Sequence, residues 1–368
     1  MARAGLGPGW DCLFANDFDE KKAATYRLNW GSNGLHVGDV AGVSTSLIEG
    51  QADLAWASFP CQDLSLAGAG AGLAGKRSGT FWPFWRLMTA LIGEGRKPRS
   101  IVLENVCGLL TSNNGQDFAA VCDAVADAGY WIGAVVADAA MFIPQSRPRL
   151  FIFALDQSEP VAGRIQSLVP NLVWHPERLC MAQSQLGSRS KSNWLWLDPP
   201  VPAPRNLQLS DVVEDNAADV NWHNVADTAR LLDMMSPVNR AKVELMARNT
   251  KRAVGCIYKR TRLEGGTKKQ RAEVRFDVAG CLRTPGGGSS RQTIIVVDNG
   301  NVRTRLITPR ETARLMGLPD SYALPNRYNE AYHLTGDGVV VPVVRHLIKH
   351  IIEPNLALTR SKYRVAGQ

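Results

Sequence analysis

Short apolar runs alternate with longer helical stretches through the first 157 residues, and this alternation constrains the fold more than any other feature of the sequence. Runs with the length of buried strands lie at 12–15, 35–38, 53–57, 100–103, 131–137 and 150–155. Apolar residues recur at helical spacing over 79–93 and 116–128. This alternation predicts an α/β fold, namely a doubly wound, mostly parallel sheet with helices on both faces.

Polar clusters follow three of these expected strands. Asp39 comes after one strand, the sequence FPCQ at 59–62 after the next, and the pair EN at 104–105 after the third. Sheets of this kind bind ligands at the carboxyl ends of their strands. We therefore expect these clusters to form the functional site.

The composition changes after about residue 157. Prolines become frequent, glycine clusters occur at 265–266 and 286–288, and a helical pattern returns at 308–316 and 339–352. Frequent proline and glycine are typical of loops and turns. We predict a catalytic and cofactor domain of residues 1–157 plus 334–368, and a smaller, loop-rich domain of residues 158–333.

Positive charge is concentrated in one segment. The formal net charge is +8, and residues 240–275 hold 12 Lys or Arg against 3 Glu, so the remainder of the chain is close to neutral. A solvated surface is one explanation of such a segment. A localised excess of this size is also typical of nucleic-acid binding.

The cysteines and histidines favour a reduced protein without a metal site. The 7 cysteines include no CxxC pair, and the 6 histidines are scattered. No apolar run is long enough to span a membrane, and the N-terminus lacks the apolar core of a signal peptide. We expect a cytoplasmic protein with no membrane partner and no metal.

Cys61 is the candidate nucleophile. A strand is expected to end just before it, Pro60 favours an extended turn, and the glycine-rich residues 68–79 follow. These features would present a thiol at a strand mouth, beside a loop able to close over it. The alternative is a structural role, because a lone cysteine is usually a small hydrophobic core residue.

Four sequence blocks occur in an order that resembles a known family. They are PCQ at 60–62, ENV at 104–106, QSRPR at 145–149 and RLITPRETARLMGLPDSY at 305–322. Together they are similar to the conserved blocks of the DNA (cytosine-5-)-methyltransferase family of bacteria and phages. The resemblance covers most of residues 10–157 and 280–352. It implies the class I S-adenosylmethionine-dependent methyltransferase fold, with residues 158–333 as the target-recognition domain.

The resemblance also implies a reaction. A methyl group would pass from S-adenosylmethionine to carbon 5 of a cytosine that is flipped out of duplex DNA. Cys61, as a thiolate, would add to carbon 6 and so activate carbon 5. Glu104 would donate a proton at ring nitrogen 3, Arg149 would hold the exocyclic oxygen, and Arg147 would support the site.

Residues for the methyl donor follow from the same resemblance. Asp17 would accept hydrogen bonds from the ribose hydroxyls, and Phe18 would stack on the adenine. Asp39 would meet the adenine amino group, although a strand-end Asp is commonly a helix cap. Pro60 and Asp337 complete the expected donor site. Asp337 departs from the family, which usually has Asn at this place.

Double-stranded DNA is the expected partner of a monomeric protein, with a cognate restriction endonuclease that acts at the same site as a further partner. Three groups of residues are expected to contact the DNA: Gln62, Ser65 and Arg77 near the nucleophile, Lys251, Arg252 and Arg260 in the basic segment, and Arg283 and Arg291 beside the second glycine cluster.

The N-terminus departs from the family pattern. A nucleotide-binding fold of this kind opens with a strand and a glycine turn, about twenty residues before the ribose-binding acid. With Asp17 as that acid, residues 1–6 are expected to form the helix behind the turn. We therefore expect the strand and the glycine turn to lie upstream of Met1, or to be missing from a truncated copy.

Two alternatives remain open. The same chemistry would act on RNA in the tRNA-methylating branch of the family, although the long insert between Arg149 and Arg305 favours duplex DNA. The missing glycine turn would also fit a nucleic-acid-binding protein without catalysis. Methyl transfer to both polymers distinguishes the first alternative, and calorimetric donor binding distinguishes the second.

Overall fold

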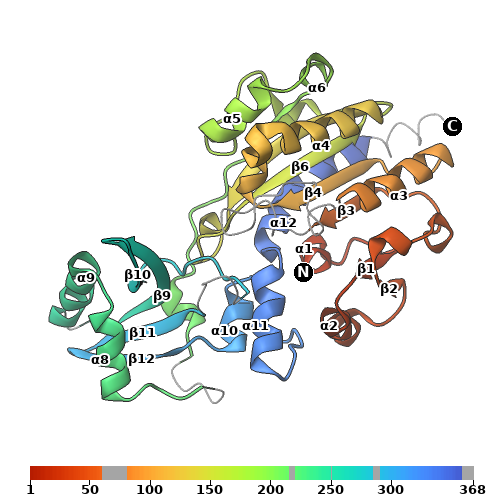
Figure 1. The fold of residues 1–368 in the computed structure, drawn as a ribbon. Coiled ribbons are helices and arrows are strands. Elements are labelled where there is room, and N and C mark those ends of the chain that lie inside the picture. The colour runs from red at the N-terminus through yellow and green to blue at the C-terminus, as the bar shows by residue number, and fades with distance from the viewer. Residues whose placement is uncertain (60–80, 215–219, 250, 285–290, 359–368) are drawn as a thin grey trace. The chain divides into compact units, whose positions relative to one another are not determined.

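The computed structural model describes residues 1–59, 81–214, 220–249, 251–284 and 291–358. The chain forms two compact units. One, the sheet unit, consists of Leu6–Asp138, Pro148–Pro202 and Val344–Gln368. The other, the hairpin unit, consists of Met1–Gly5, Ala139–Arg147 and Ala203–Val343. Figure 1 shows the elements of both.

A four-stranded sheet with the order β3-β4-β6-β5 is the centre of the sheet unit. Its strands are β3 (Leu54–Ser58), β4 (Ser100–Asn105), β5 (Tyr130–Asp138) and β6 (Pro148–Asp156). β3 and β4 are parallel, whereas β6 is antiparallel to both β4 and β5. It follows that β3, β4 and β5 run in one direction and β6 runs against them, which confirms a mixed α/β fold with a mostly parallel sheet.

The strands β1 (Ala15–Asp17) and β2 (Leu35–Val37) form a separate parallel pair. β1 starts at the last residue of the expected strand 12–15, because its pairing with β2 begins at Ala15↔Leu35. Residues 1–6 were expected to be helical, and α1 (Ala2–Leu6) confirms this. The helix α2 (Glu20–Trp30) lies between β1 and β2 along the chain.

Two amphipathic helices cover one face of the sheet and contribute to its core. α3 (Phe81–Gly93) buries Phe81, Trp85, Leu87, Met88 and Leu91, and α4 (Gln116–Asp127) buries Phe118, Val121, Cys122 and Val125. They pack in one cluster with alternate residues of the central strands, such as Ile101 and Leu103 of β4 and Ile152 of β6. Burial of each such side chain contributes about 1.5–3 kcal/mol.

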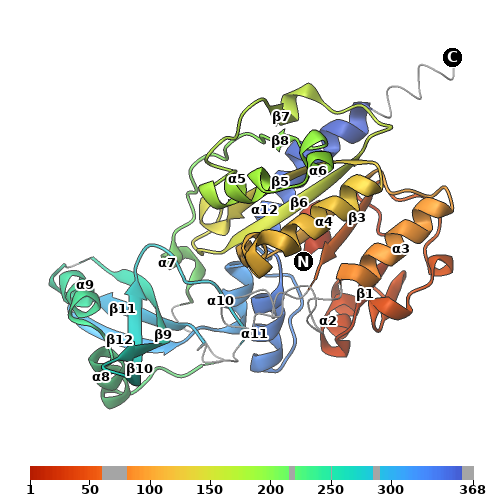
Figure 2. The same cartoon turned by 45° about the horizontal axis from the view of Figure 1, so that its top comes forward.

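The second face of the sheet is also covered. Every residue of β4 is buried, as expected for a strand with helices on both sides. Both Figure 1 and Figure 2 draw the C-terminal helical segment from Val344 on the side of the sheet away from α3 and α4. This segment comprises the end of α12 (Val341–Leu347) and a π-helical turn (Ile348–Ile352). The doubly wound arrangement is thereby confirmed.

Residues 158–202 close the free edge of β5. Main-chain bonds join Ile132 N to Asn193 O at 2.8 Å, Leu195 N to Ile132 O at 2.6 Å and Val136 N to Trp174 O at 2.8 Å. The segment also contains β7 (Gln166–Ser167), α5 (Glu177–Ser184), α6 (Ser188–Ser192) and β8 (Trp196–Leu197). The change in composition near residue 158 therefore does not coincide with the boundary of the compact units, which lies at Pro202–Ala203.

The hairpin unit is built on an antiparallel sheet with the order β10-β9-β11-β12. Its strands are β9 (Ala253–Glu264), β10 (Thr267–Arg275), β11 (Thr293–Asp298) and β12 (Asn301–Leu306). Gly265 and Gly266 join β9 to β10 with φ angles of +55° and +77°. A two-residue turn with positive φ at both positions is the type I′ turn that favours glycine.

One face of this sheet packs against α8 (Val225–Asp233) and α9 (Pro237–Arg248). The cluster contains Leu231 and Val243 from the helices and Ile257, Val274 and Ile295 from the strands. β11 pairs with β9 as far as Ile257, whereas β10 pairs with β9 as far as Glu264. Residues 258–273 therefore form a two-stranded ribbon that projects past β11. We call it the basic ribbon.

A buried ion pair fixes the transition from β12 to α10 (Pro309–Arg314). Arg305 and Glu311 are both 0% exposed and meet through Arg305 Nη2 and Glu311 Oε1 at 2.5 Å and through Nη1 and Oε2 at 2.9 Å. Glu311 also completes a capping box with Thr308 at the start of α10. The unit further contains α7 (Leu209–Val212) and α11 (Tyr328–Asp337).

The substitution Glu311→Gln is expected to lower the free energy of unfolding by about 3 kcal/mol, because it leaves the buried Arg305 charge without its counter-ion. Urea denaturation measures this. Asp227→Asn is the matched control: it breaks the Asp227–Arg230 pair, whose side chains are 44% and 77% exposed. The control should change the unfolding free energy by about 0.5 kcal/mol or less. Equal effects of the two substitutions would show that the buried pair does not stabilise the unit.

Candidate functional site

The end of β4 and the start of β6 bring Glu104 and Arg149 together. Antiparallel pairing sets Glu104 opposite Phe151 and Asn105 opposite Leu150, so Arg149 lies at the carboxyl end of β4. Arg149 Nε is 3.3 Å from Glu104 Oε1, and the side chains are 16% and 9% exposed. Arg149 Nη1 also donates to the carbonyl of Pro148 at 2.9 Å.

This pair can bind a small planar polar ring edge-on. A guanidinium is a fixed fork of donors, and a carboxyl group accepts when ionised and donates when protonated. The two groups lie side by side at the carboxyl end of β4. There they can present a carboxyl group and guanidinium N–H donors to neighbouring atoms of one ring. The low exposure of both side chains strengthens their electrostatic interaction with a ligand.

Asn105 ties the ends of β3 and β4 together, a role that the sequence analysis did not assign. It is 3% exposed, and its Nδ2 donates to the carbonyl of Phe59 at 3.2 Å while its Oδ1 accepts from Val106 N at 2.8 Å. A usable signal was present in the sequence, since a polar amide at the end of a buried strand must find partners for both its donor and its acceptor. Asn105 thus holds the main chain of the residue that precedes Pro60.

Phe59 and Phe81 flank residues 60–80, and their rings are in contact. Their centroids are 5.6 Å apart, and Phe81 also contacts Trp82 and Trp85 at 4.9 Å and 5.9 Å. The segment that contains the candidate nucleophile therefore begins and ends at one aromatic cluster. Five expected site residues lie outside the described residues: Cys61, together with Pro60, Gln62, Ser65 and Arg77.

The carboxyl end of β1 carries an acid and an exposed aromatic side chain. Burial raises the pKa of Asp17, and a hydrogen bond from Asp19 N to Asp17 Oδ1 at 2.8 Å opposes this rise. The neighbouring Phe18 is 79% exposed. Asn16 Nδ2 joins β1 to β2 by donating to the carbonyls of His36 at 3.1 Å and Gly38 at 3.0 Å. The Asp17 carboxylate can accept hydrogen bonds from ribose hydroxyls, and the exposed Phe18 ring can stack on a base. This combination fits a nucleoside.

Asp39 caps the short 3-10 helix Val40–Gly42 by accepting from Ala41 N at 2.9 Å. The structure thus shows the helix-cap alternative for this residue. The expected contact with an adenine amino group stays a prediction. A carboxylate has several lone pairs, so the cap leaves capacity for a further hydrogen bond.

Arg147 belongs to the hairpin unit, whereas Glu104 and Arg149 belong to the sheet unit. Arg147 is 2% exposed. Its Nη1 donates to Leu282 O at 2.7 Å and to Cys281 Sγ at 3.3 Å, and its Nη2 donates to Gly336 O at 2.8 Å and Gly338 O at 2.7 Å. These bonds clamp the chain around residues 281–282 to the segment 336–338.

Asp337 lies between the two glycines that Arg147 holds. Its Oδ1 accepts from Thr284 Oγ1 at 2.5 Å. Gln145, which is 0% exposed, adds a second link by accepting from Leu282 N at 3.1 Å through Oε1 and donating to Leu315 O at 2.5 Å through Nε2. The expected donor contact of Asp337 stays a prediction.

The described cations expected to contact DNA differ in their surroundings. Lys251, Arg252, Arg260 and Arg283 are exposed. The guanidinium of Arg260 lies 5.0 Å from the centre of the Tyr258 ring. Arg291 is partly buried: it donates to Asn329 Oδ1 and lies 5.3 Å from the centre of the Tyr328 ring. Arg291 therefore has structural partners within the hairpin unit.

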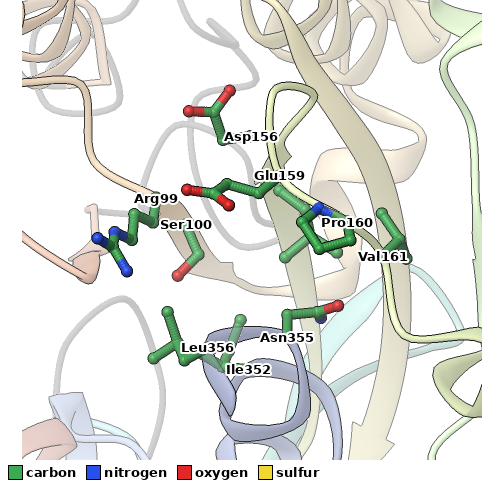
Figure 3. Close-up of a pocket in the computed structure, with 10 residues that line it drawn as sticks. Arg99, Ser100, Asp156, Glu159, Pro160, Val161, Ile352, Asn355 and Leu356 are labelled. Carbon is green, nitrogen blue, oxygen red and sulfur yellow. The ribbon is translucent and has the colours of Figure 1, made fainter. Parts of the chain in front are cut away.

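A small pocket lies at the opposite end of the central strands (Figure 3). It is lined by residues from the start of β4, the end of β6 and the C-terminal segment, among them Ser100, Asp156 and Asn355. Because Ser100 is the first residue of β4 and Glu104 lies near its end, this pocket is separate from the Glu104–Arg149 pair. Within the described ranges, no helix is long and apolar enough to cross a membrane, and no group of three or more metal-ligating side chains occurs.

The family model described as C-5 cytosine-specific DNA methylase matches residues 2–353. The Type II methyltransferase M.Bsp6I of Bacillus sp. (strain RFL6) is 25% identical over 94% of this chain and 93% of its own length. The Type II methyltransferase M.HhaI of Haemophilus parahaemolyticus is 25% identical over 93% of this chain and 88% of its own length.

A solved structure shares the fold. The crystal structure of the S. pombe Dnmt2 methyltransferase superposes with a TM-score of 0.53 at 17% identity, and the match covers 94% of this chain and 91% of that one. At this identity, the likeness shows the fold alone, and the fold is that of class I S-adenosylmethionine-dependent methyltransferases.

Arg147→Lys is expected to lower the free energy of unfolding by at least about 2 kcal/mol, because each buried carbonyl left without a donor costs about 1–3 kcal/mol. The lysine ammonium lacks the planar fork that reaches several carbonyls at once. Arg240→Lys is the control, since the Arg240 side chain is 42% exposed and makes surface ion pairs. Urea unfolding of both variants tests the clamp, and a loss no larger than that of the control would contradict it.

Proposed function

This chain belongs to the C-5 cytosine-specific DNA methylase family and methylates carbon 5 of cytosine in DNA, and we propose that Cys61, Glu104 and Arg149 carry out the reaction. The observation that carries the assignment of these residues is the buried Glu104–Arg149 pair at the carboxyl end of β4. Asn105 adds support, because it links this strand end to Phe59, two residues before Cys61.

Cys61 is the proposed nucleophile. Its thiolate forms a bond to carbon 6 of the cytosine ring, and the electron pair of the 5,6 double bond forms the bond from carbon 5 to the methyl group as the bond from that methyl group to the donor sulfur breaks. Loss of the proton from carbon 5 to solvent, of the proton gained at nitrogen 3, and of the thiolate from carbon 6 then restores the aromatic ring. Splitting a difficult substitution into an addition and an elimination is the usual benefit of covalent catalysis.

Glu104 and Arg149 are proposed to hold the ring during this addition. As carbon 6 is attacked, negative charge develops on the ring, and a proton from the Glu104 carboxyl group at nitrogen 3 offsets it. Arg149 donates to the exocyclic oxygen. The 3.3 Å contact between the two side chains fits binding to neighbouring ring positions. A cytosine can reach these two side chains only after it leaves the base stack of the DNA helix.

S-adenosylmethionine supplies the methyl group when bound. Asp17 is proposed to accept hydrogen bonds from the ribose hydroxyls, and the exposed ring of Phe18 to stack on the adenine. Asp39 and Asp337 are the further proposed contacts, with Pro60 beside the methyl donor. Protonation of Asp17 would remove its negative charge and weaken it as an acceptor, and burial makes that protonation easier by raising the pKa of Asp17.

Recognition of DNA is proposed to lie in residues 158–333, with catalysis and donor binding in 1–157 plus 334–368. The basic ribbon of the hairpin unit supports this, because its exposed Arg260 and the exposed Lys251 and Arg252 nearby in sequence offer contacts to phosphates. We further propose that the enzyme acts as a monomer in the cytoplasm on double-stranded DNA. A restriction endonuclease with the same target sequence is the proposed companion.

Cys61→Ser is expected to abolish methyl transfer, because a serine hydroxyl is far less ionised and less nucleophilic than a thiol. Transfer of a labelled methyl group to DNA measures the rate. The control Cys180→Ser changes a partly buried cysteine of the sheet unit and should leave the rate unchanged. A Cys61→Ser variant with the wild-type rate would disprove the nucleophile assignment.

We expect both the affinity for DNA and the salt dependence of that affinity to fall when five basic residues are replaced by Gln. These residues are Lys251, Arg252, Lys259, Arg260 and Arg262. Each lost phosphate contact should reduce the slope of log K against log salt by about 0.9. The control variant has Gln in place of basic residues of the sheet unit, namely Lys21, Arg27, Arg189 and Lys191. If the two variants had the same slope, the replaced residues of segment 251–262 would face solvent in the complex and would not contact the phosphates.

A further inference from the structure

The basic ribbon has two faces, and α8 and α9 cover only the inner part of one of them. Directly opposed residues of an antiparallel pair point to the same side, and side chains alternate along each strand. On one face Ile257, Ala272 and Val274, each at most 1% exposed, pack in a cluster with residues of α8 and α9. Farther along this face, toward the turn at 265–266, the side chains are exposed.

Four of these exposed side chains form what we call the outer face of the ribbon. The register pairs Thr261 with Gln270 and Leu263 with Lys268. The ribbon holds 6 Lys or Arg among its 16 residues, yet three of the four residues of the outer face are uncharged. Leu263 is 73% exposed. An amide, a hydroxyl and an apolar side chain gain little from phosphates, so the outer face is suited to a different part of DNA.

The opposite face of the ribbon is occupied by contacts within the chain. Tyr258 donates a hydrogen bond to Glu273 Oε2 at 2.6 Å. The guanidinium groups of Arg260 and Arg275 lie 5.0 Å and 5.8 Å from the centre of the Tyr258 ring. Charged groups of this kind position a protein on the DNA backbone, whereas sequence is read at the base edges. The outer face is therefore the better candidate for reading bases.

The major groove contains one kind of base pair that matches the outer face. This groove admits a two-stranded ribbon. Adenine presents the N7 acceptor and the N6 amino donor, which the amide of a Gln side chain contacts with two hydrogen bonds. Thymine presents a C5 methyl group, which takes apolar contacts. An A·T pair carries both features, so Gln270 fits the adenine and Leu263 fits the methyl group of a thymine.

The spacing of Gln270 and Leu263 fits base pairs that are close in sequence. Leu263 lies opposite Lys268, and Gln270 is two residues from Lys268 on β10, so Gln270 and Leu263 form a diagonal pair. Residues in such a pair are about 7–8 Å apart. Successive nucleotides of one strand follow each other about every 3.4 Å along the DNA axis. The two side chains can therefore reach base pairs that are one or two steps apart.

We propose that the outer face reads A·T base pairs in the major groove beside the methylated cytosine. Gln270 binds an adenine, and Leu263 contacts the methyl group of a thymine. This inference rests on the proposed function of the chain as a DNA methyltransferase. Figure 2 shows β9 and β10, which carry both residues, at the edge of the sheet formed with β11 and β12.

The first test uses the full-length protein and a library of DNA duplexes randomised around cytosine, with methylated positions read by bisulfite sequencing. The wild type should prefer adenine at one flanking position and thymine at another, at most two steps away. Gln270→Ala should reduce the preference for adenine roughly 5- to 150-fold, as expected for the loss of one specific base contact. Leu263→Ala should reduce only the preference for thymine.

Modified bases test each contact without a change in the protein. Uracil lacks only the C5 methyl group of thymine, so it should slow methyl transfer by the wild type roughly fourfold, as expected for one buried methyl-sized group. It should not slow the Leu263→Ala variant. The base 7-deazaadenine lacks the N7 acceptor of adenine, so it should slow the wild type but not the Gln270→Ala variant.

Leu245→Ala and Gln166→Ala are the matched controls, since Leu245 is 57% exposed on α9 and Gln166 is exposed on β7 of the sheet unit. Both should keep the wild-type preference. Three results would overturn the proposal: a wild type without a preference for A·T pairs, an equal loss of preference in the controls, or equal rates on thymine and uracil DNA. A wild-type protein that methylates no cytosine at carbon 5 would overturn the proposed function, and this inference with it.

Discussion

The antiparallel pairing of β6 with β4 is the constraint on which the site depends. A strand parallel to β4 would enter the sheet at the far end, and its first residues would lie near Ser100. Because β6 runs the other way, its first residues lie at the carboxyl end of β4, and Arg149 meets Glu104 at 3.3 Å. The one reversed strand of the sheet thereby joins a carboxyl group and a guanidinium at the edge where parallel sheets bind their ligands.

The segment Gln145–Arg149 contains residues of both compact units, because the boundary lies between Arg147 and Pro148. Gln145 and Arg147 are buried in the hairpin unit, where they bind main-chain carbonyl and amide groups at Leu282, Leu315 and the glycines around Asp337. Two residues later, Arg149 pairs with Glu104 in the sheet unit. A short stretch of sequence thus combines a structural anchor with a proposed catalytic group.

Periodicity predicted the elements that are repetitive and buried, and missed what depends on individual tertiary contacts. The strands β3 to β6 and the helices α3 and α4 start and end within a few residues of their expected limits, because buried strands and amphipathic helices have regular patterns. The prolines at 170–204 predicted loops and turns, whereas the chain there also forms α5, α6 and β8. Composition carries no information on which sheet edge this chain covers, and here it pairs with β5. The sequence placed Glu104 and Arg149 in one site through family resemblance. Asn105 was not assigned, since its partner Phe59 is set by strand register rather than by spacing.

The central claim is that Cys61 bonds covalently to cytosine, and the most direct measurement is mass spectrometry of the trapped adduct. DNA in which 5-fluorocytosine replaces cytosine would be incubated with the protein and S-adenosylmethionine, then digested. Fluorine at carbon 5 cannot leave as a proton does, so elimination stops and the sulfur–carbon bond persists. The account predicts a methylated, fluorinated pyrimidine on the peptide that contains Cys61. An adduct on another cysteine, such as Cys107, or methylated DNA with no adduct at all, would contradict it.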